Sequence, residues 1–362
     1  MSGTDGWVST GLAWRDGRAV LSAVHGRRTH EREVVPGTGV GWRLGGPRRC
    51  IGALLVGRVE RTPCPHRAAI APDGGAVQCP PCQSVDRGLA LARDRILDDG
   101  RTYRLYLAWF GEGLLKVGLT AEQRGTSRLL EQGALAWTFA ARGALPAVRR
   151  AELTLSAAGL ARERFKVRAK VEHWWEHGDA AHRRTVLTDA RARAHDLLPG
   201  HDVELLPDHP VVDQVGLFGL TGGAPAVYDA VEGLADGAVV AGRLRAPIGR
   251  HLLLDRPGGE PPLLLDTRLL TGWTLTPAPG RPPSGCRWSP GSGRSPRTPR
   301  KRCSDGAAEP ARPRSAAAPP RAPVNAVPVA ADVLRRGSVT GTVQGRFRSP
   351  GSPSVRADQR RS

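Results

Sequence analysis

The chain has 362 residues, 40% of them hydrophobic, and a formal net charge of +19. This size allows one to three domains with a core. Its first residues, MSGTDGWVSTG, lack the apolar segment of a secretory signal, and no apolar run is long enough for a membrane helix. We therefore expect a cytoplasmic protein without membrane partners, in which the six cysteines bind metal or stay reduced.

The positive charge is unevenly distributed. Of 53 basic and 34 acidic residues, 17 basic and 4 acidic ones lie from Arg281 onward, so the preceding part carries 36 and 30. A basic chain indicates a polyanionic partner, usually nucleic acid. That argument rests mainly on the tail, because the body carries only +6.

Residues 1–49 are predicted to form an N-terminal β region. Asp16-Gly17 separates two short apolar runs, at 12–15 and 18–21, which is a strong hairpin signal. Residues 51–59 are a further strand candidate.

A cysteine cluster follows, in residues 50–84. Cys79 and Cys82 are separated by two residues, a spacing that lets two thiolates bind one ion. Cys64 supplies a third ligand, and either Cys50 or His66 the fourth. We expect one structural zinc ion here. The alternative is four reduced, buried cysteines.

An α/β domain is predicted for residues 85–200. It opens with a helix over 85–98, two strands over 104–109 and 114–119 that form a hairpin, and a helix containing Leu129 and Leu130. A third strand over 135–141 and a helix that begins near Pro146 and runs to about residue 160 follow.

The second half of this domain contains a basic segment and a long helix. Basic and apolar residues alternate from Arg164 to Val171, which predicts a strand with a basic face. That face would be a solvated sheet edge or a phosphate-binding stripe. Asp179 is placed to cap a helix that ends near residue 198.

Two further regions complete the chain. Residues 210–278 contain short strand candidates at 215–220, 238–244, 250–254 and 262–266, which predict a small β module. Residues 279–362 are rich in Pro, Arg, Ser, Ala and Gly and are expected to be disordered. This composition fits a functional basic tail, and equally an out-of-frame translation of GC-rich DNA.

The order strand, tight loop, strand, helix in residues 103–134 resembles the GIY-YIG endonuclease superfamily. Arg104-Leu105-Tyr106 and Lys116-Val117-Gly118 stand at the places of its two tripeptides, and Arg128 at that of its helical Arg. The resemblance implies that Tyr106 helps to activate a water and that Arg128 stabilises phosphoryl charge. Lys116 replaces the second Tyr, which favours loss of catalysis, and Lys116 and Gly118 become phosphate-binding candidates.

The same resemblance makes Glu152 the ligand of a Mg²⁺ or Mn²⁺ ion. The spacing of Glu152 from Arg149 also fits a surface ion pair on a helix. The two interpretations stay open from the sequence alone.

A second resemblance covers about residues 50–273. The phrases KVGLT and RLLEQGA after a cysteine cluster are similar to a bacterial and archaeal domain-of-unknown-function family, and favour Cys50 over His66. We therefore expect an α+β chain: N-terminal β hairpins and a zinc knuckle, a central GIY-YIG-like α/β unit, a small C-terminal β module and a disordered basic tail.

Three functions compete. The favoured one is a zinc-stabilised nucleic-acid-binding protein whose GIY-YIG-like domain has lost catalysis. The alternatives are a divalent-metal-dependent nuclease of that type, and a protein or small-molecule interaction module without a nucleic-acid role.

Overall fold

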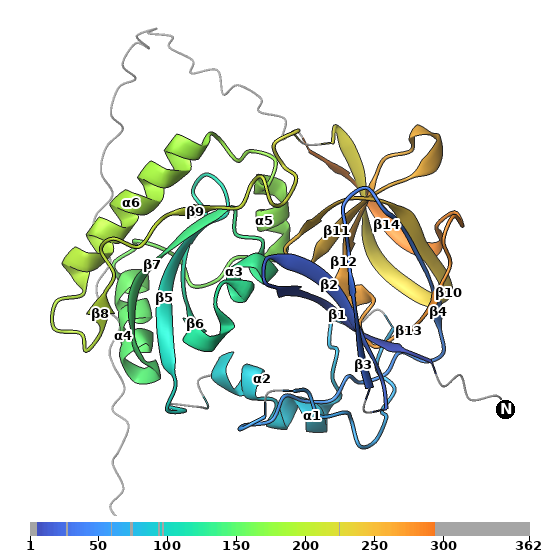
Figure 1. The fold of residues 1–362 in the computed structure, drawn as a ribbon, viewed down its shortest axis with the longest axis horizontal. Coiled ribbons are helices and arrows are strands. Elements are labelled where there is room, and N and C mark those ends of the chain that lie inside the picture. Colours follow the sequence, from blue (N-terminus) through green and yellow to red (C-terminus); the bar gives the residue numbers. More distant parts are fainter. Residues whose placement is uncertain are drawn as a thin grey trace, which may run out of the picture. The chain divides into compact units, whose positions relative to one another are not determined.

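The computed structural model describes residues 6–26, 28–58, 60–72, 75–92, 95, 98–223 and 225–293. The chain divides into two compact units, 1–299 and 300–362, and all described residues belong to the first. Two sheets and several helices form this unit, so the expected α+β class is confirmed (Figure 1). In the part of the chain that the structure describes, no helix has both the length and the apolar character needed to cross a membrane.

A nine-stranded sheet takes strands from both halves of this unit. Their order is β11-β12-β10-β4-β13-β1-β2-β3, and β14 pairs with β10. The strands are β1 (Val8–Arg15), β2 (Arg18–His25), β3 (Arg28–Glu33), β4 (Gly39–Gly45), β10 (Val227–Ile248), β11 (His251–Asp255), β12 (Leu263–Asp266), β13 (Thr274–Pro277) and β14 (Ser284–Ser292). Residues 1–49 and 210–278, expected as separate regions, thus contribute to one sheet.

Strand β10 connects most of this sheet. Its centre pairs with β4, its beginning with β12 and its end with β11. Because β11 and β12 also pair with each other, β10 curves around them. The hairpin predicted at Asp16-Gly17 is confirmed, with both residues at positive φ between β1 and β2.

The expectation of disorder from residue 279 onward is wrong for β14. This strand pairs with β10 from Val227 opposite Ser292 to Val239 opposite Ser284. Strand pairing uses backbone hydrogen bonds, so a sequence poor in apolar residues can still be held by a long neighbour. The remainder of the expected tail, from residue 294, lies outside the described residues.

The second sheet has the order β6-β5-β7-β8, with β9 also paired to β7. Its strands are β5 (Thr102–Trp109), β6 (Leu115–Ala121), β7 (Ala136–Ala144), β8 (Glu204–Leu205) and β9 (Val212–Asp213). The predicted strands at 104–109, 114–119 and 135–141 are confirmed. Residues 215–220, predicted as a strand, form turns instead, and residues 51–58 form no strand.

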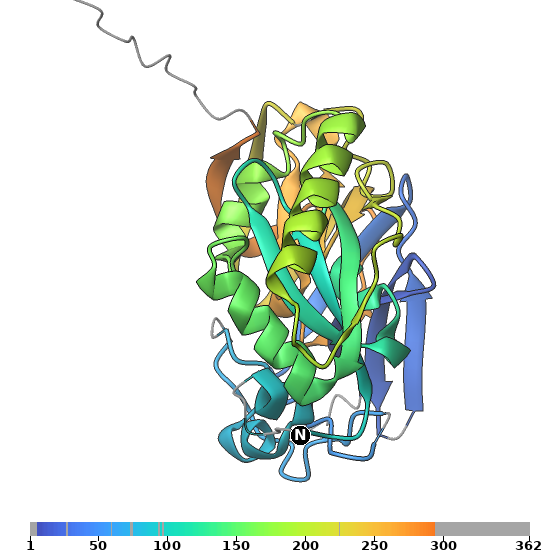
Figure 2. The same cartoon turned by 90° about the vertical axis from the view of Figure 1, so that its left-hand side faces the viewer.

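Helices cover both faces of the second sheet. The α-helices are α1 (Pro80–Val85), α2 (Arg87–Ala92), α3 (Ser127–Gln132), α4 (Leu145–Ala157), α5 (Val167–His173) and α6 (Ala180–Leu197); the 3₁₀ helices are η1 (Glu122–Arg124), η2 (Pro257–Gly259) and η3 (Thr267–Leu269). Helices α4 and α6 lie on one face, and α3 lies on the side of the first sheet (Figures 1 and 2).

Local signals at the starts of α4 and α6 are confirmed. Pro146 lies in the first turn of α4. Asp179 caps α6, and its carboxylate accepts a hydrogen bond of 2.6 Å from the backbone N–H of His182. The helix expected over 85–98 instead breaks at Asp86 into α1 and α2, and residues 93, 94, 96 and 97 lie outside the described residues.

The strand predicted for the basic segment is wrong. Residues 167–173 form helix α5, because Val171 and Trp174 share one helical face and are buried in the core. The same letters fit a period of two and a period of 3.6. Burial of the Trp174 ring favours the helical period.

The two sheets meet at a pair of glycines. Gly133 ends α3 at φ 67°, and Gly249 lies in the β10–β11 turn at φ 61°. A Cβ atom on Gly249 would lie 2.9 Å from the backbone nitrogen of Gly133. Two indoles fix this contact: Trp14 Nε1 donates to the Gly249 carbonyl at 2.6 Å, and Trp174 Nε1 to the Gly133 carbonyl at 3.3 Å.

We expect the substitution Gly249→Ala to lower the free energy of unfolding by about 2–3 kcal/mol, because the added methyl group meets backbone atoms that cannot move aside. Gly200→Ala is the matched control: Gly200 has φ 81°, and a Cβ there meets nothing within 4 Å. It should cost about 1 kcal/mol. Urea denaturation measures both, and equal losses would contradict a steric role for the glycine pair.

Candidate functional site

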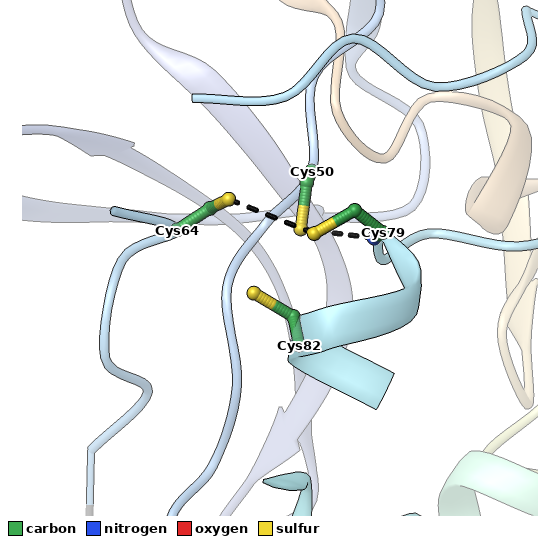
Figure 3. Close-up of side chains that lie close together, drawn as sticks. All are labelled: Cys50, Cys64, Cys79 and Cys82. Atoms are coloured by element: carbon green, nitrogen blue, oxygen red, sulfur yellow. Dashed lines mark hydrogen bonds between the residues drawn. The ribbon is translucent and has the colours of Figure 1, made fainter. Parts of the chain in front are cut away.

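The four predicted cysteines converge. The Sγ atoms of Cys50, Cys64, Cys79 and Cys82 all lie within 4.8 Å of one another, and all four residues are buried (Figure 3). The Cys64 and Cys79 sulfurs are 3.8 Å apart. Four sulfurs placed about 2.3 Å from a tetrahedral zinc ion would be about 3.8 Å apart. The donor set and its spacing therefore fit a metal ion.

Cys50, and not His66, completes this group. The backbone N–H groups of Gly52 and Cys79 both donate to the Cys50 sulfur, at 3.3 and 3.2 Å. Burial acts to raise the pKa of Cys64, but hydrogen bonds from the backbone of Ala68 and His66 outweigh it and lower that pKa to about 7. His66 thus contributes its backbone to the cluster.

A buried carboxylate joins the cluster to its surroundings. Asp86 accepts hydrogen bonds from the backbone N–H of Leu54 at 2.9 Å and of Leu89 at 3.1 Å. It also accepts from Gln78 Nε2 at 2.8 Å and from Arg61 at 3.2 Å. Burial raises the pKa of Asp86, but these donors lower it below its ordinary value. The carboxylate therefore remains ionised at neutral pH. It links the start of α2 to the cysteine-cluster segments that contain Leu54, Arg61 and Gln78.

A cleft of about 1720 Å³ lies beside the cluster, and we name it the basic cleft. Its walls come from the cysteine region, the β1–β2 turn, β6, α3, α4 and residues 163–170. Eleven basic side chains line it against five acidic ones. The basic ones are Arg15, Arg58, Arg61, Arg87, Arg101, Lys116, Arg124, Arg128, Arg149, Arg164 and Lys170, and the acidic ones are Asp16, Asp86, Glu131, Glu152 and Glu163.

All five candidates from the GIY-YIG resemblance line this cleft: Tyr106, Lys116, Gly118, Arg128 and Glu152. Tyr106 and Gly118 are directly opposite each other on β5 and β6. A Cβ on Gly118 would lie 2.2 Å from the Tyr106 hydroxyl oxygen, so the glycine makes room for the ring. Gln132 Nε2 donates to that oxygen at 2.8 Å, which leaves the phenolic O–H free to donate to a ligand.

Lys116 is buried on the same face of β6 as Gly118. Its ammonium group donates to the carbonyl oxygens of Val117, at 2.9 Å, and Glu163. It also lies 5.6 Å from the centre of the Tyr106 ring. An ammonium has three N–H donors, so one remains for a ligand.

Arg128 and Glu152 differ in accessibility. The Arg128 side chain is 45% exposed, and its nearest carboxylate, Glu131, is 3.9 Å away. Glu152 is buried and receives a 2.9 Å hydrogen bond from Arg149. Burial raises the pKa of Glu152, and the charges of Arg149 and Lys116 oppose that rise. Glu152 thus forms the ion pair with Arg149 that the spacing predicted, but in a buried position and not at the surface, and it also lines the cleft.

Two cleft residues, Thr120 and Gln132, had no role assigned from the sequence, and Lys170 was named only as part of a basic-faced strand. Thr120 follows Lys116 and Gly118 at alternate positions of β6, and its buried hydroxyl has no hydrogen-bond partner among the described residues. The period of two could have found it. Lys170 has no such signal, since its segment was predicted as a strand and only the fold brings α5 to the cleft.

We expect one metal ion per chain in freshly purified, reduced protein. Cys82→Ser should lose the ion and lower stability by several kcal/mol, because metal-binding energy is folding energy in such sites. Cys286→Ser is the matched control, since that cysteine lies on β14 away from the cluster. Elemental analysis and thermal melting check this. A chain without stoichiometric metal would contradict the assignment.

Lys170 should make stability depend on pH. Burial, with the charges of Lys116, Arg128 and Arg250, lowers its pKa to about 7. From about pH 7 to 10 the unfolded chain therefore binds more protons at this residue than the folded chain does, so the free energy of unfolding rises with pH. Below pH 7 the lysine is charged in both states, and its full destabilising effect is present. Lys170→Met should stabilise the protein by on the order of 1 kcal/mol at pH 6 and by less at pH 9. Urea denaturation at both values measures this, and a larger gain at pH 9 would contradict it.

Comparison with known proteins gives one result. Residues 94–275 match the family model described as Protein of unknown function (DUF2797), a range that begins after the cysteine cluster and ends in β13. No curated protein and no solved structure matches. The predicted resemblance to a domain-of-unknown-function family is confirmed, and no match supports the resemblance to GIY-YIG endonucleases. With half of its length matched, the chain belongs to this family of proteins of unknown function.

Proposed function

We propose that this chain is a zinc-stabilised nucleic-acid-binding protein that holds the phosphate backbone in the basic cleft. The observation that carries the proposal is the excess of basic over acidic side chains in that cleft, eleven against five. The part of the chain before the tail carries a formal charge of only +6. Arg15 and Arg101 pair with Glu31 and Asp99, which do not line the cleft, so an excess of four positive charges remains on one concave surface, where it attracts polyanions most strongly.

The size of the cleft supports a polymer over a small molecule. Pockets for small ligands usually enclose roughly 300–1,000 Å³. The basic cleft is larger, about 1720 Å³, and is lined by charged groups from several elements. This argues against the small-molecule interaction module, the third function considered from the sequence.

Individual donors in the cleft suit phosphate oxygens. Arg128 has a half-exposed guanidinium that can meet two phosphate oxygens at once. Lys116 and the Tyr106 hydroxyl each retain one N–H or O–H donor. Gly118 carries no Cβ, and the Tyr106 ring takes that space, so the glycine supports binding by placing the Tyr106 hydroxyl.

We further propose that β5, β6, α3, β7 and α4 form a GIY-YIG-like unit. Their order is the strand, strand, helix, strand, helix order that the resemblance implies, with β5 between β6 and β7. Tyr106, Gly118, Arg128 and Glu152 occupy the corresponding places and line one cleft.

Metal-dependent cleavage is a second candidate, favoured by this shared placement of Tyr106, Arg128 and Glu152. The ion pair of Glu152 with Arg149 and the replacement of the second Tyr by Lys116 argue against it. A Mg²⁺ or Mn²⁺ ion at Glu152 would have to displace Arg149. Binding without cleavage is therefore the better supported function.

Zinc is the metal that we propose for the cysteine cluster. Four thiolates in tetrahedral arrangement are typical of zinc or of iron–sulfur centres. Four sulfurs within 4.8 Å of one another, with one pair 3.8 Å apart, suit a structural zinc ion with no open position for catalysis. Iron instead of zinc in the elemental analysis would contradict this choice.

The test of binding uses the full chain, so that the tail contributes equally to every variant. We expect Arg128→Ala to weaken binding of single-stranded DNA or RNA several-fold and to reduce the slope of log K against log salt by about 0.7–1. Arg193→Ala, at an exposed position of α6 outside the cleft, removes the same charge and should have little effect. Fluorescence anisotropy across a salt series measures both.

The outcomes separate the candidates. Equal effects of Arg128→Ala and Arg193→Ala would show that the cleft does not bind nucleic acid. Cleavage in Mg²⁺ or Mn²⁺ that is lost in Glu152→Gln would instead establish the nuclease. Binding without cleavage in either metal would leave the binding protein.

A further inference from the structure

Two lysines in the basic cleft lie over aromatic rings of one small core cluster. Lys170 Nζ is 3.8 Å from the centre of the Phe110 ring, and Lys116 Nζ is 5.6 Å from that of Tyr106. Both rings belong to the buried cluster on the α3 side of the second sheet. Neither lysine forms an ion pair with a carboxylate within the described ranges. Two cations are thus held at one apolar wall without a directly paired carboxylate.

Further cations surround Lys170 on other elements. Arg128 comes from α3 and Arg250 from the β10–β11 turn, and both act on the charge of Lys170, as does Lys116. Arg250 is paired with Asp266, at 3.3 Å, and it lies outside the cleft wall. The acidic Glu152 in the cleft is matched by Arg149. Arg128 shares Glu131 with Arg124, at 3.9 and 2.7 Å, and Lys116 shares the charge of Glu152 with Arg149, so Lys116, Lys170 and Arg128 together carry more positive charge than the carboxylates beside them.

We propose that Lys116, Lys170 and Arg128 bind the terminal phosphate monoester of a nucleic-acid strand. This rests on the proposed function, because it assigns one end of the strand to one part of the basic cleft. A phosphate monoester carries close to two negative charges at neutral pH. A diester within a strand carries one. Three neighbouring cations, two of them partly or fully buried, match the doubly charged group better.

The hydrogen-bond donors also match. A monoester offers three oxygens that accept strong hydrogen bonds. The free N–H of Lys116, the three N–H groups of Lys170 and the planar guanidinium of Arg128 can meet them from three different elements. The Tyr106 O–H is a further donor at the same wall. The low pKa of Lys170 shows how much its charge costs here, and a bound dianion would offset that cost.

The experiment compares oligonucleotides that differ only in their ends. Four single-stranded versions of one sequence carry a 5′-phosphate, a 3′-phosphate, both or neither, and a mononucleotide serves as a competitor. We expect one phosphorylated end to tighten binding to the full chain roughly tenfold, as an added set of charge-assisted hydrogen bonds would. The tail contributes equally to all four and cancels in the ratio. The phosphorylated end that binds more tightly, or competition by the mononucleotide, identifies the source of the monoester.

Lys170→Met should reduce this ratio to below about twofold, and any loss of binding that the two kinds of strand share cancels in the ratio. The substitution keeps an unbranched apolar side chain against Phe110 and removes a buried charge, so the variant should fold. Arg168→Met is the matched control. It removes one charge from the same helix, but its side chain lies outside the basic cleft.

Two failures are distinguishable. If all four oligonucleotides bind equally and Arg128→Ala weakens the binding of all of them, the site for the terminal phosphate monoester is wrong and the proposed function stands. If none of them responds to Arg128→Ala, the proposed function falls with it. If Lys170→Met and Arg168→Met lower the affinity ratio of phosphorylated to unphosphorylated strands equally, the site for the terminal phosphate monoester is also wrong.

Discussion

The contact between Gly133 and Gly249 is the constraint on which the candidate site depends. It brings the end of α3 against the β10–β11 turn at a separation that no side chain permits. Trp14 and Trp174 hold the two carbonyl groups in place from the first sheet and from the segment after α5. Arg128 is on α3 and Lys170 on α5, so this junction sets where both cations lie. A looser junction would disperse the charge.

The basic cleft stores unfavourable electrostatic energy in the free protein. Lys116 is buried and Lys170 partly so, each against an aromatic ring, and the cations reinforce one another's cost. Cation–ring contacts recover only part of the solvation lost by such groups. A structure held together by its core alone would gain from apolar residues at these positions. The proposed phosphate ligand would account for a charge at Lys170 that lowers stability in the free protein.

The metal cluster and the cleft form a continuous structure. Asp86 receives hydrogen bonds from both loops of the cluster, and Asp86 and Arg61 also line the cleft. A Cβ on Gly52 would meet the Thr62 carbonyl oxygen at 1.9 Å, so the two loops touch through their backbones. The cysteine-cluster region is short and has no sheet of its own, so it needs such contacts to keep its conformation. Under the proposed function, the cysteine cluster would support binding by holding one wall of the cleft in position.

The sequence alone determined features that depend on neighbours in the chain. The Asp16-Gly17 hairpin, the β5–β6 hairpin, the cap at Asp179 and the Cys79–Cys82 pair follow from short-range spacing. The choice of Cys50 over His66, and the candidates Tyr106, Lys116, Gly118, Arg128 and Glu152, came from family resemblances. Tertiary structure decided the rest. Helix α5 forms because Trp174, at its end, is buried in the core. Strand β14 forms because it pairs with β10. Lys170 reaches the cleft only through those long-range contacts, which local periodicity cannot encode.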